Sequence, residues 1–179
     1  FPNPYRPLLQ MNEGENAGDA VIRYMEEVVF HKLVPPTEVA GILIEPVQGE
    51  GGYIYPPDDF LPALRQLCDK YEILLIADEV QSGMGRTGKW WAVDHYDVEP
   101  DILCIAKGIA SGVPMGVMTA KAELMTWPSG SHGNTFGGNP LAWAAALKTI
   151  ELIETQYIVT TQKMGELALA IMRDLQTEH

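Results

Sequence analysis

Three short and almost uninterrupted apolar runs predict three buried strands. They cover residues 40–44, 73–77 and 102–106 and are rich in Ile, Leu and Ala. Runs of this length without polar alternation are typical of parallel strands that are covered on both faces. We therefore expect an α/β fold in which a mostly parallel sheet has helices on both faces.

Segments with helical periodicity separate the predicted strands. Apolar residues recur at helical spacing over residues 21–29, and Pro35 and Pro36 end that helix at about residue 34. A second amphipathic helix is predicted over residues 60–71. The order strand, helix, strand indicates parallel strands joined by a crossover helix.

Two further helices are expected after a short possible strand at residues 116–120. Asn139 and Pro140 form a cap and a first turn, which start a helix that runs to about residue 154. The final helix, over residues 157–176, has an apolar face made of Met164, Leu167, Ala168, Ile171 and Leu175. We expect the helix methionines to fill the core, among them Met25, Met164 and Met172.

Composition and charge narrow the class of protein. The chain has 179 residues, of which 46% are hydrophobic and 20% charged, as in soluble globular proteins. The net charge of -12 disfavours nucleic acid and anionic membranes as partners, because binding to both depends on an excess of Lys and Arg. Cys68 and Cys104 lack C-x-x-C spacing, so we expect neither a disulfide scaffold nor a zinc site, and a reducing, cytoplasmic setting.

We expect the sequence to be part of a larger protein. It begins at Phe1 with an irregular lead-in over residues 1–14, and its last helical pattern reaches His179 without a stop signal.

Two suggestive patterns have plain explanations. Gly83 to Lys89 matches the G-x-x-x-x-G-K half of a P-loop, but Trp90 stands where Ser or Thr would bind Mg²⁺. We interpret this segment as a glycine-rich surface turn. The histidines lie far apart without carboxylates or cysteines at ligand spacing, so we predict no metal site at His31, His95, His132 or His179.

A charged residue follows each of the three predicted strands: Glu45, Asp78 and Lys107. Ligands of open α/β sheets bind at the carboxyl ends of the strands, so two carboxylates and one amine should converge at that edge. A charge beside buried aliphatic residues costs several kcal/mol unless it is paired or used. A structural ion pair is the plain alternative, and a functional site is the interpretation we favour.

The amine and one carboxylate suit pyridoxal phosphate (PLP). A lysine amine such as that of Lys107 can condense with an aldehyde to form a Schiff base. Asp78, at the end of a neighbouring strand, could hold the positive charge of a protonated ring nitrogen. PLP chemistry needs both groups, because the protonated ring accepts electrons.

Four motifs resemble those of the class III aminotransferases and occur in the same order: residues 45–52, 75–90, 100–108 and 132–140. Lys107 follows Asp78 at the separation that the family pattern has. The resemblance extends over nearly the whole chain, is closest over residues 39–154, and is nearest to the 4-aminobutyrate and acetylornithine aminotransferase branch.

The resemblance implies a role for each matching residue around the cofactor. Lys107 would be the Schiff-base lysine, and it would also carry the proton between the substrate's α-carbon and C4′ of the cofactor. Asp78 would pair with the pyridine nitrogen, Val80 would pack under the ring, and Gln81 would hydrogen-bond the phenolic oxygen.

The resemblance also implies a homodimer with a shared active site. Thr135 would bind the cofactor phosphate of the partner subunit. Glu45 would line the substrate pocket, and Glu50 matches a glutamate that in several relatives pairs with a switching arginine. After Lys107 the chain reads Gly-Ile-Ala-Ser-Gly-Val-Pro where relatives often carry a run of glycines, which could alter cofactor contacts.

The domain organisation implied is that of a fold-type-I PLP-dependent transferase. Residues 1–154 would be part of the large PLP-binding domain, and residues 155–179 a helix leading toward a C-terminal small domain. The switching arginine would belong to that small domain. The Gly-Ser/Thr phosphate loop and the aromatic residue that stacks on the cofactor would lie upstream of Phe1.

The function implied is transfer of an amino group from an α- or ω-amino donor to a 2-oxo acid or aldehyde. Two alternatives stay open. Some members of the same family are amino-acid racemases or epimerases, and the four motifs do not separate them from aminotransferases. The chain as given could also be a catalytically incompetent piece, because it lacks part of the phosphate cradle.

Overall fold

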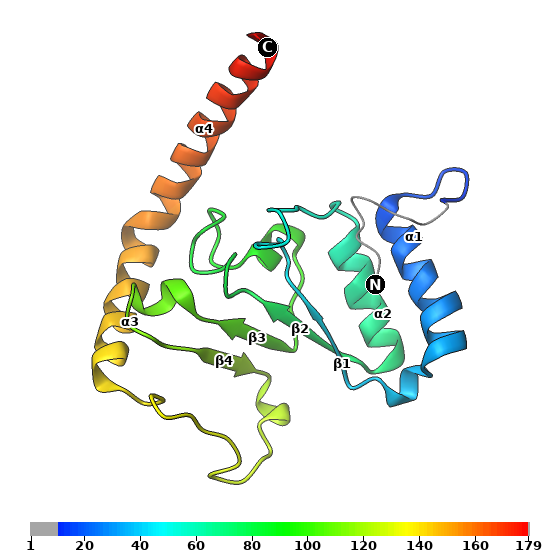
Figure 1. Cartoon of the computed structure of the whole chain (residues 1–179), viewed down its shortest axis with the longest axis horizontal. Helices are drawn as coiled ribbons and strands as arrows, with labels where there is room; N and C mark the ends of the chain where they lie inside the picture. Colours follow the sequence, from blue (N-terminus) through cyan, green and yellow to red (C-terminus); the bar gives the residue numbers. More distant parts are fainter. Residues whose placement is uncertain (1–10, 179) are drawn as a thin grey trace.

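Figure 1 shows a computed structural model of the chain, which describes residues 11–178. Most of the lead-in predicted over residues 1–14 lies outside the described residues, as does His179. No helix within residues 11–178 is both long enough and apolar enough to cross a membrane.

In the part of the chain that the structure describes, four strands form one sheet in the order β1-β2-β3-β4. They are β1 (Gly41–Ile44), β2 (Leu74–Asp78), β3 (Ile102–Ile105) and β4 (Val117–Ala120). The pairs β1–β2 and β2–β3 are parallel, and β4 is antiparallel to β3. The short connection between β3 and β4 explains that reversal, because parallel neighbours require a crossover of a dozen or more residues. The mostly parallel α/β fold is confirmed.

Within the described residues, four α-helices accompany the sheet, at positions close to those predicted. They are α1 (Ala17–Tyr24), α2 (Phe60–Tyr71), α3 (Pro140–Leu152) and α4 (Ile158–Glu178). Two π-helical segments, η1 (Met25–Leu33) and η6 (Ile153–Tyr157), extend α1 and join α3 to α4. The predicted helix start is confirmed, because the Asn139 side chain accepts a hydrogen bond from the Leu141 amide at 3.0 Å.

Shorter 3-10 helices lie in the connections. They are η2 (Pro36–Glu38), η3 (Ala92–Tyr96), η4 (Lys107–Ala110) and η5 (Ala122–Leu124). Of these, η3 and η4 border the ends of β2 and β3, so they help to place the residues that follow those strands.

The buried core lies on one face of the sheet. Its first cluster joins α1 and α2 to β1 and β2 and includes Val21, Phe60, Leu64, Ile42 and Leu75. Its second cluster joins β2 and β3 to η4 and α3 and includes Ala77, Leu103, Ile105, Ile109 and Ala146. Strand register places the inward residues of both clusters on the same side, since Ile42 pairs with Leu75 and Ala77 pairs with Leu103.

The opposite face of the sheet is only partly covered in the part of the chain that the structure describes. Leu43 of β1 is 61% exposed and Met118 of β4 is 39% exposed. Ile76, the register partner of Leu43, and Cys104, the register partner of Met118, are half-buried. The expectation of helices on both faces is therefore met on one face alone among residues 11–178.

The methionine prediction holds for η1 but is wrong for α4. Met25 is buried, whereas Met164 and Met172 are 54% and 64% exposed. Figure 1 shows the reason, because α4 projects away from the sheet and the other helices. A hydrophobic stripe marks the side of a helix that can be buried, but not whether a partner lies beside it.

Candidate functional site

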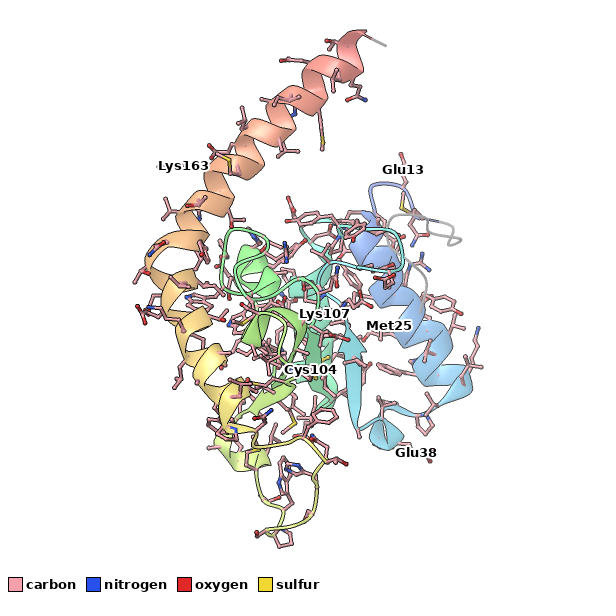
Figure 2. The ribbon with its side chains drawn as sticks, turned by 60° about the vertical axis from the view of Figure 1, so that its left-hand side comes forward. Glu13, Met25, Glu38, Cys104, Lys107 and Lys163 are labelled. Carbon is pink, nitrogen blue, oxygen red and sulfur yellow. The ribbon has the colours of Figure 1, made fainter. Side chains whose placement is uncertain are left out.

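Glu45, Asp78 and Lys107 all lie at the carboxyl edge of the parallel strands. Glu45 follows β1, Asp78 ends β2, and Lys107 comes two residues after β3. Figure 2 shows Lys107 beyond the end of the strand that carries Cys104. The predicted placement of the three charged residues at one edge agrees with the strand order.

The Lys107 amine contacts the loop that follows β2. Its Nζ donates a hydrogen bond to Oε1 of Gln81, and the Lys107 side chain is exposed. The partner is therefore the neutral amide of Gln81 and not a carboxylate, as it would be in the plain alternative of a structural ion pair. An amine held by a neutral acceptor at an open edge is accessible to an aldehyde.

The backbone at Lys107 is strained. Its φ is 44°, in the left-handed region, which costs a non-glycine residue about 1–2 kcal/mol. The short helix η4 holds this conformation, because the Ile109 amide bonds to the Ala106 carbonyl at 3.1 Å and the Ile109 and Ala110 side chains are buried. Such strain is concentrated at functional sites, and here it occurs at the residue that carries the amine.

A close approach joins the segment after β1 to Gln81. Oε2 of Glu45 accepts a hydrogen bond from the Gly49 amide at 2.7 Å, which closes a tight turn. A Cβ atom on Gly49 would stand 2.7 Å from Cγ of Gln81, so only glycine leaves room for that side chain. Glu45, Gly49, Gln81 and Lys107 therefore form one connected row along the edge.

Asp78 lies on the partly covered face, beside the thiol of Cys104. The two residues are register partners in β2 and β3. Burial, and to a smaller extent the negative charge of Asp78, raise the pKa of the Cys104 thiol. The Asp78 carboxylate is half-buried, and its Oδ1 accepts a hydrogen bond from the Val80 amide at 3.1 Å.

Glu79 is a residue of the site that the sequence analysis missed. Its side chain is fully buried, and burial raises the pKa of the carboxyl group despite hydrogen bonds that oppose the rise. Ser82 Oγ donates to Glu79 Oε2 at 2.5 Å, and the Val93 amide donates to Glu79 Oε1 at 2.9 Å. The second carboxylate of the pair Asp78-Glu79, directly after an apolar run, was the available signal.

Of the other predicted site residues, Glu50 directly follows Gly49 and Val80 directly precedes Gln81, whereas Thr135 lies in a different segment of the chain. Glu50 and Thr135 are exposed, and Val80 is half-buried. The neighbours of Thr135, Asn134 and Phe136, line a separate apolar pocket that Lys107 does not line. The structure therefore does not bring Thr135 to the amine of its own chain.

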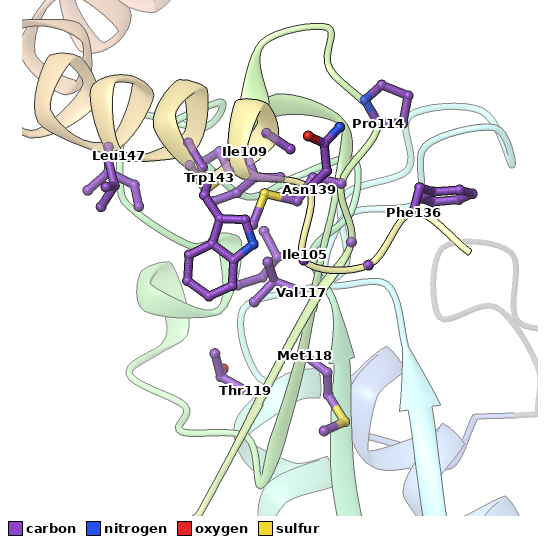
Figure 3. A pocket seen from close by; sticks show the side chains of 18 of the residues that line it. Ile105, Ile109, Pro114, Val117, Met118, Thr119, Phe136, Asn139, Trp143 and Leu147 are labelled. Atoms are coloured by element: carbon purple, nitrogen blue, oxygen red, sulfur yellow. The ribbon is translucent and has the colours of Figure 1, made fainter. Parts of the chain in front are cut away.

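That pocket has a volume of about 800 Å³ and lies between the β3–β4 edge and α3. Figure 3 shows Trp143 of α3 beside Val117 and Ile105, with Phe136 farther along the wall. Its walls are mainly apolar and carry neither Asp78 nor Lys107.

The segment from Gly83 to Lys89 forms turns, but not the surface turn that was predicted. Gly83, Gly85 and Gly88 are buried, because they pack against Trp91, Ile153 and Gln162 respectively. Lys89 donates a hydrogen bond to the Asp94 carbonyl at 2.6 Å. Among residues 11–178, no group of three or more His, Cys, Asp or Glu side chains could hold a metal ion.

Comparison with known proteins decides the family. The sequence profile of the family described as Aminotransferase class-III matches residues 2–179. The chain belongs to the class III aminotransferases. The resemblance seen in the four motifs is thus confirmed, and the fold of this class III chain is similar to that of PLP-dependent transaminases.

Relatives of this class III chain include both aminotransferases and a racemase. An acetylornithine aminotransferase of Methanopyrus kandleri is 42% identical and covers 98% of this chain and 44% of that protein. An alanine/serine racemase of Pyrococcus horikoshii is 38% identical over 98% of this chain and 38% of that protein.

A solved structure is similarly close. The ornithine aminotransferase of Toxoplasma gondii, described with partial occupancy of PLP at its active site, is 34% identical with a TM-score of 0.76. The match covers 90% of this chain and 36% of that one. The chain spans less than half the length of these three relatives.

PLP is the cofactor of the class III family, and the edge residues fit it. Lys107 offers an exposed amine, and Gln81 offers an amide that already hydrogen-bonds to that amine. Asp78 offers a half-buried carboxylate at the end of the adjacent strand. An aldehyde, a phenolic oxygen and a ring nitrogen require these three kinds of partner.

Proposed function

We propose that the full-length protein is an aminotransferase that uses PLP to move an amino group from an α- or ω-amino donor to a 2-oxo acid or aldehyde. One observation carries the proposal: the Lys107 amine, hydrogen-bonded to Gln81, stands at the strand edge where Asp78 ends the neighbouring strand. When bound, the cofactor supplies a ring that accepts electron density from the substrate's α-carbon.

Lys107 would bind the aldehyde carbon of the cofactor through its Nζ. The same Nζ would also carry a proton between the substrate's α-carbon and C4′ of the cofactor. The exposed position of the Lys107 side chain leaves it accessible to substrate.

Asp78, Val80 and Gln81 would set the cofactor's orientation. The Asp78 carboxylate would keep the ring nitrogen protonated, Val80 would pack against the ring, and the Gln81 amide would hydrogen-bond the phenolic oxygen. Their spacing along one strand end and its turn supports this division, because Asp78 lies on the partly covered face and Gln81 faces Lys107.

Glu45, Glu50 and Thr135 would act at the borders of the site. Glu45 would line the substrate pocket, where its hydrogen bond to Gly49 fixes the carboxylate. Glu50 would pair with an arginine elsewhere in the polypeptide. Thr135 would reach the cofactor phosphate in a second subunit, which fits its exposed position away from Lys107 and makes the protein a homodimer.

The remaining features belong to the same proposal. Residues 1–154 would form part of the large domain, and residues 155–179 a helix toward a small domain. The amino donor would resemble 4-aminobutyrate or acetylornithine, and the protein would act in the cytoplasm. A catalytically incompetent segment is the second candidate for the 179 residues taken alone.

Racemisation is the alternative that a specific observation favours, because the Pyrococcus horikoshii relative carries that name at 38% identity. Incubating the full-length protein and PLP with one L-amino acid and no oxo acid separates the two functions. An aminotransferase releases one equivalent of 2-oxo acid per site. A racemase abolishes the optical rotation of the solution without releasing oxo acid.

The assignment of Lys107 is tested by borohydride reduction of the full-length protein with PLP, followed by mass analysis of its peptides. We expect the cofactor's mass on the peptide that contains Lys107. Lys107→Ala should remove that mass and lower turnover at least about 100-fold. Lys148→Ala, which alters an exposed lysine paired with Glu151, is the control and should change neither. Cofactor on another lysine would refute the proposal.

A further inference from the structure

We propose that Glu79 is a positioning residue, which fixes the turn after β2 so that the Gln81 side chain faces Lys107. The consequence of this role for catalysis rests on the function proposed above. The geometric part stands on contacts within the chain. Glu79 touches neither Lys107 nor the edge where a substrate would bind, so its effect would pass through Gln81.

Glu79 is unusual because its carboxyl side chain is buried. The side chain is fully buried, although an isolated buried carboxylate is strongly unfavourable. Each carboxylate oxygen has a donor, because Ser82 Oγ bonds to Oε2 at 2.5 Å and the Val93 amide bonds to Oε1 at 2.9 Å. Buried polar groups that are fully satisfied specify one local arrangement.

The backbone of Glu79 ties the same turn to β3. Its amide donates to the Cys104 carbonyl at 3.0 Å, and its carbonyl accepts from the Gly83 amide at 2.9 Å. A Cβ on Gly83 would lie 2.8 Å from the Glu79 carbonyl oxygen and 2.8 Å from the Trp91 ring. Glu79 thus joins the end of β3, the turn over residues 79–83 and the start of η3.

Gln81 lies within the turn over residues 79–83, which the hydrogen bonds of Glu79 stabilise. The hydrogen bond from Ser82 to Glu79 spans the turn, and Gln81 is one of the two residues between these partners. The backbone of Gly49 packs against Gln81 from the other side, where a Cβ added to Gly49 would lie 2.7 Å from Cγ of Gln81. The Gln81 amide therefore has little freedom except toward Lys107. Loss of the Glu79 bonds would release the turn and with it the amide.

A second buried carboxylate provides a matched control. Asp101 lies at the opposite end of β3 and accepts hydrogen bonds from Arg65 and the Leu75 amide, both at 2.8 Å. Replacing it should weaken the fold without reaching the turn over residues 79–83. Asp101→Asn therefore measures what the loss of a buried carboxylate does to stability alone.

The test measures acetylation of Lys107 in the full-length protein after removal of cofactor, with acetic anhydride as the probe and peptide mass analysis as the readout. Gln81→Ala should speed labelling about fivefold, because the amine loses its hydrogen-bond acceptor. Glu79→Gln replaces one of the two oxygens that accept hydrogen bonds by an amide nitrogen. It should also speed labelling, by at least half the factor expected for Gln81→Ala. Asp101→Asn should lower the melting temperature but label like the unaltered protein.

A labelling rate in Glu79→Gln equal to that of the unaltered protein would overturn the proposal and leave Glu79 a purely structural residue. If Glu79→Gln does not fold, Ser82→Ala removes only the hydroxyl donor, and its labelling rate decides in the same way. Failure of PLP to bind at Lys107 would refute the proposed function, but it would not affect the comparison of the Lys107 acetylation rates.

Discussion

Asp101 at the start of β3 accepts a hydrogen bond from Arg65 of α2 at 2.8 Å and so ties the helix layer to the sheet. The same carboxylate accepts from Lys121 at 2.7 Å on its other oxygen. Burial alone would raise the pKa of Asp101, but hydrogen bonds from Lys121, the Leu75 amide and Arg65 outweigh burial and lower it to about 2. The ion pair between Asp101 and Arg65 therefore stabilises the fold at the end of β3 that lies away from Lys107.

The lowered pKa of Asp101 predicts a loss of stability in acid. A depressed carboxyl pKa stabilises the fold fully above the unfolded value of 3.8, and the contribution is lost as pH falls from about 4 to about 2. The contribution is about 2 kcal/mol. Urea unfolding of the full-length protein at pH 6, 4 and 3 measures it, with the pH values chosen to cover the start of that range.

Asp101→Asn is the control for that titration. At pH 6 it should lower the free energy of unfolding, because Arg65 and Lys121 lose their shared counter-charge. Its difference from the unaltered protein should shrink as pH falls toward 3. A difference that stays constant with pH would mean that another group governs the acid transition.

Asn139→Ala should destabilise α3 by about 1 kcal/mol, because the Leu141 amide loses the side-chain oxygen that caps the helix. Asn139→Asp keeps an acceptor in place and should leave stability nearly unchanged. Thermal unfolding of the two variants makes the comparison. Equal melting temperatures for them would show that the cap does not stabilise the helix.

Gly49→Ala should strain the site directly. The added Cβ would lie 2.7 Å from Cγ of Gln81, so either the turn after β1 or the Gln81 side chain must move. Overpacking of this kind costs about 1–3 kcal/mol. Gly116→Ala is the control, because a Cβ there meets no atom within 4 Å. Urea unfolding measures the free energy of unfolding of both variants. Equal values would contradict the prediction.

The strands and their charged ends could be predicted because an apolar run that stops at a charge carries both signals in the sequence. Which of the two carboxylates, Asp78 or Glu79, is buried could not be predicted. Alternation places adjacent side chains on opposite faces, and both faces were expected to be covered. The structure shows that Glu79 is buried, where the Val93 amide of η3 bonds to it, and that Asp78 is left on the partly covered face.

The hydrogen bond between Gln81 and Lys107 was similarly beyond the sequence. It joins residues from two loops, and its direction depends on the absence of a side chain at Gly49. The apolar face of α4 shows the same limit, because the stripe containing Met164 was visible but its lack of a packed neighbour in the described residues was not. Family resemblance supplied the role of Gln81, which periodicity alone could not.

Because Asp78 lies beside Cys104, we expect the reactivity of the Cys104 thiol to depend on the charge of the Asp78 carboxylate. Cys104 has a raised pKa, first from burial and then from the charge of Asp78. Asp78→Asn removes that charge, so more thiolate is present at pH 8 and alkylation by iodoacetamide should be about twofold faster. Cys68, whose pKa burial raises to about 11, should react slowly in both proteins and serves as the internal control. Faster alkylation of both cysteines would indicate general loosening, whereas an unchanged rate at Cys104 would contradict the effect of the Asp78 charge on the thiol.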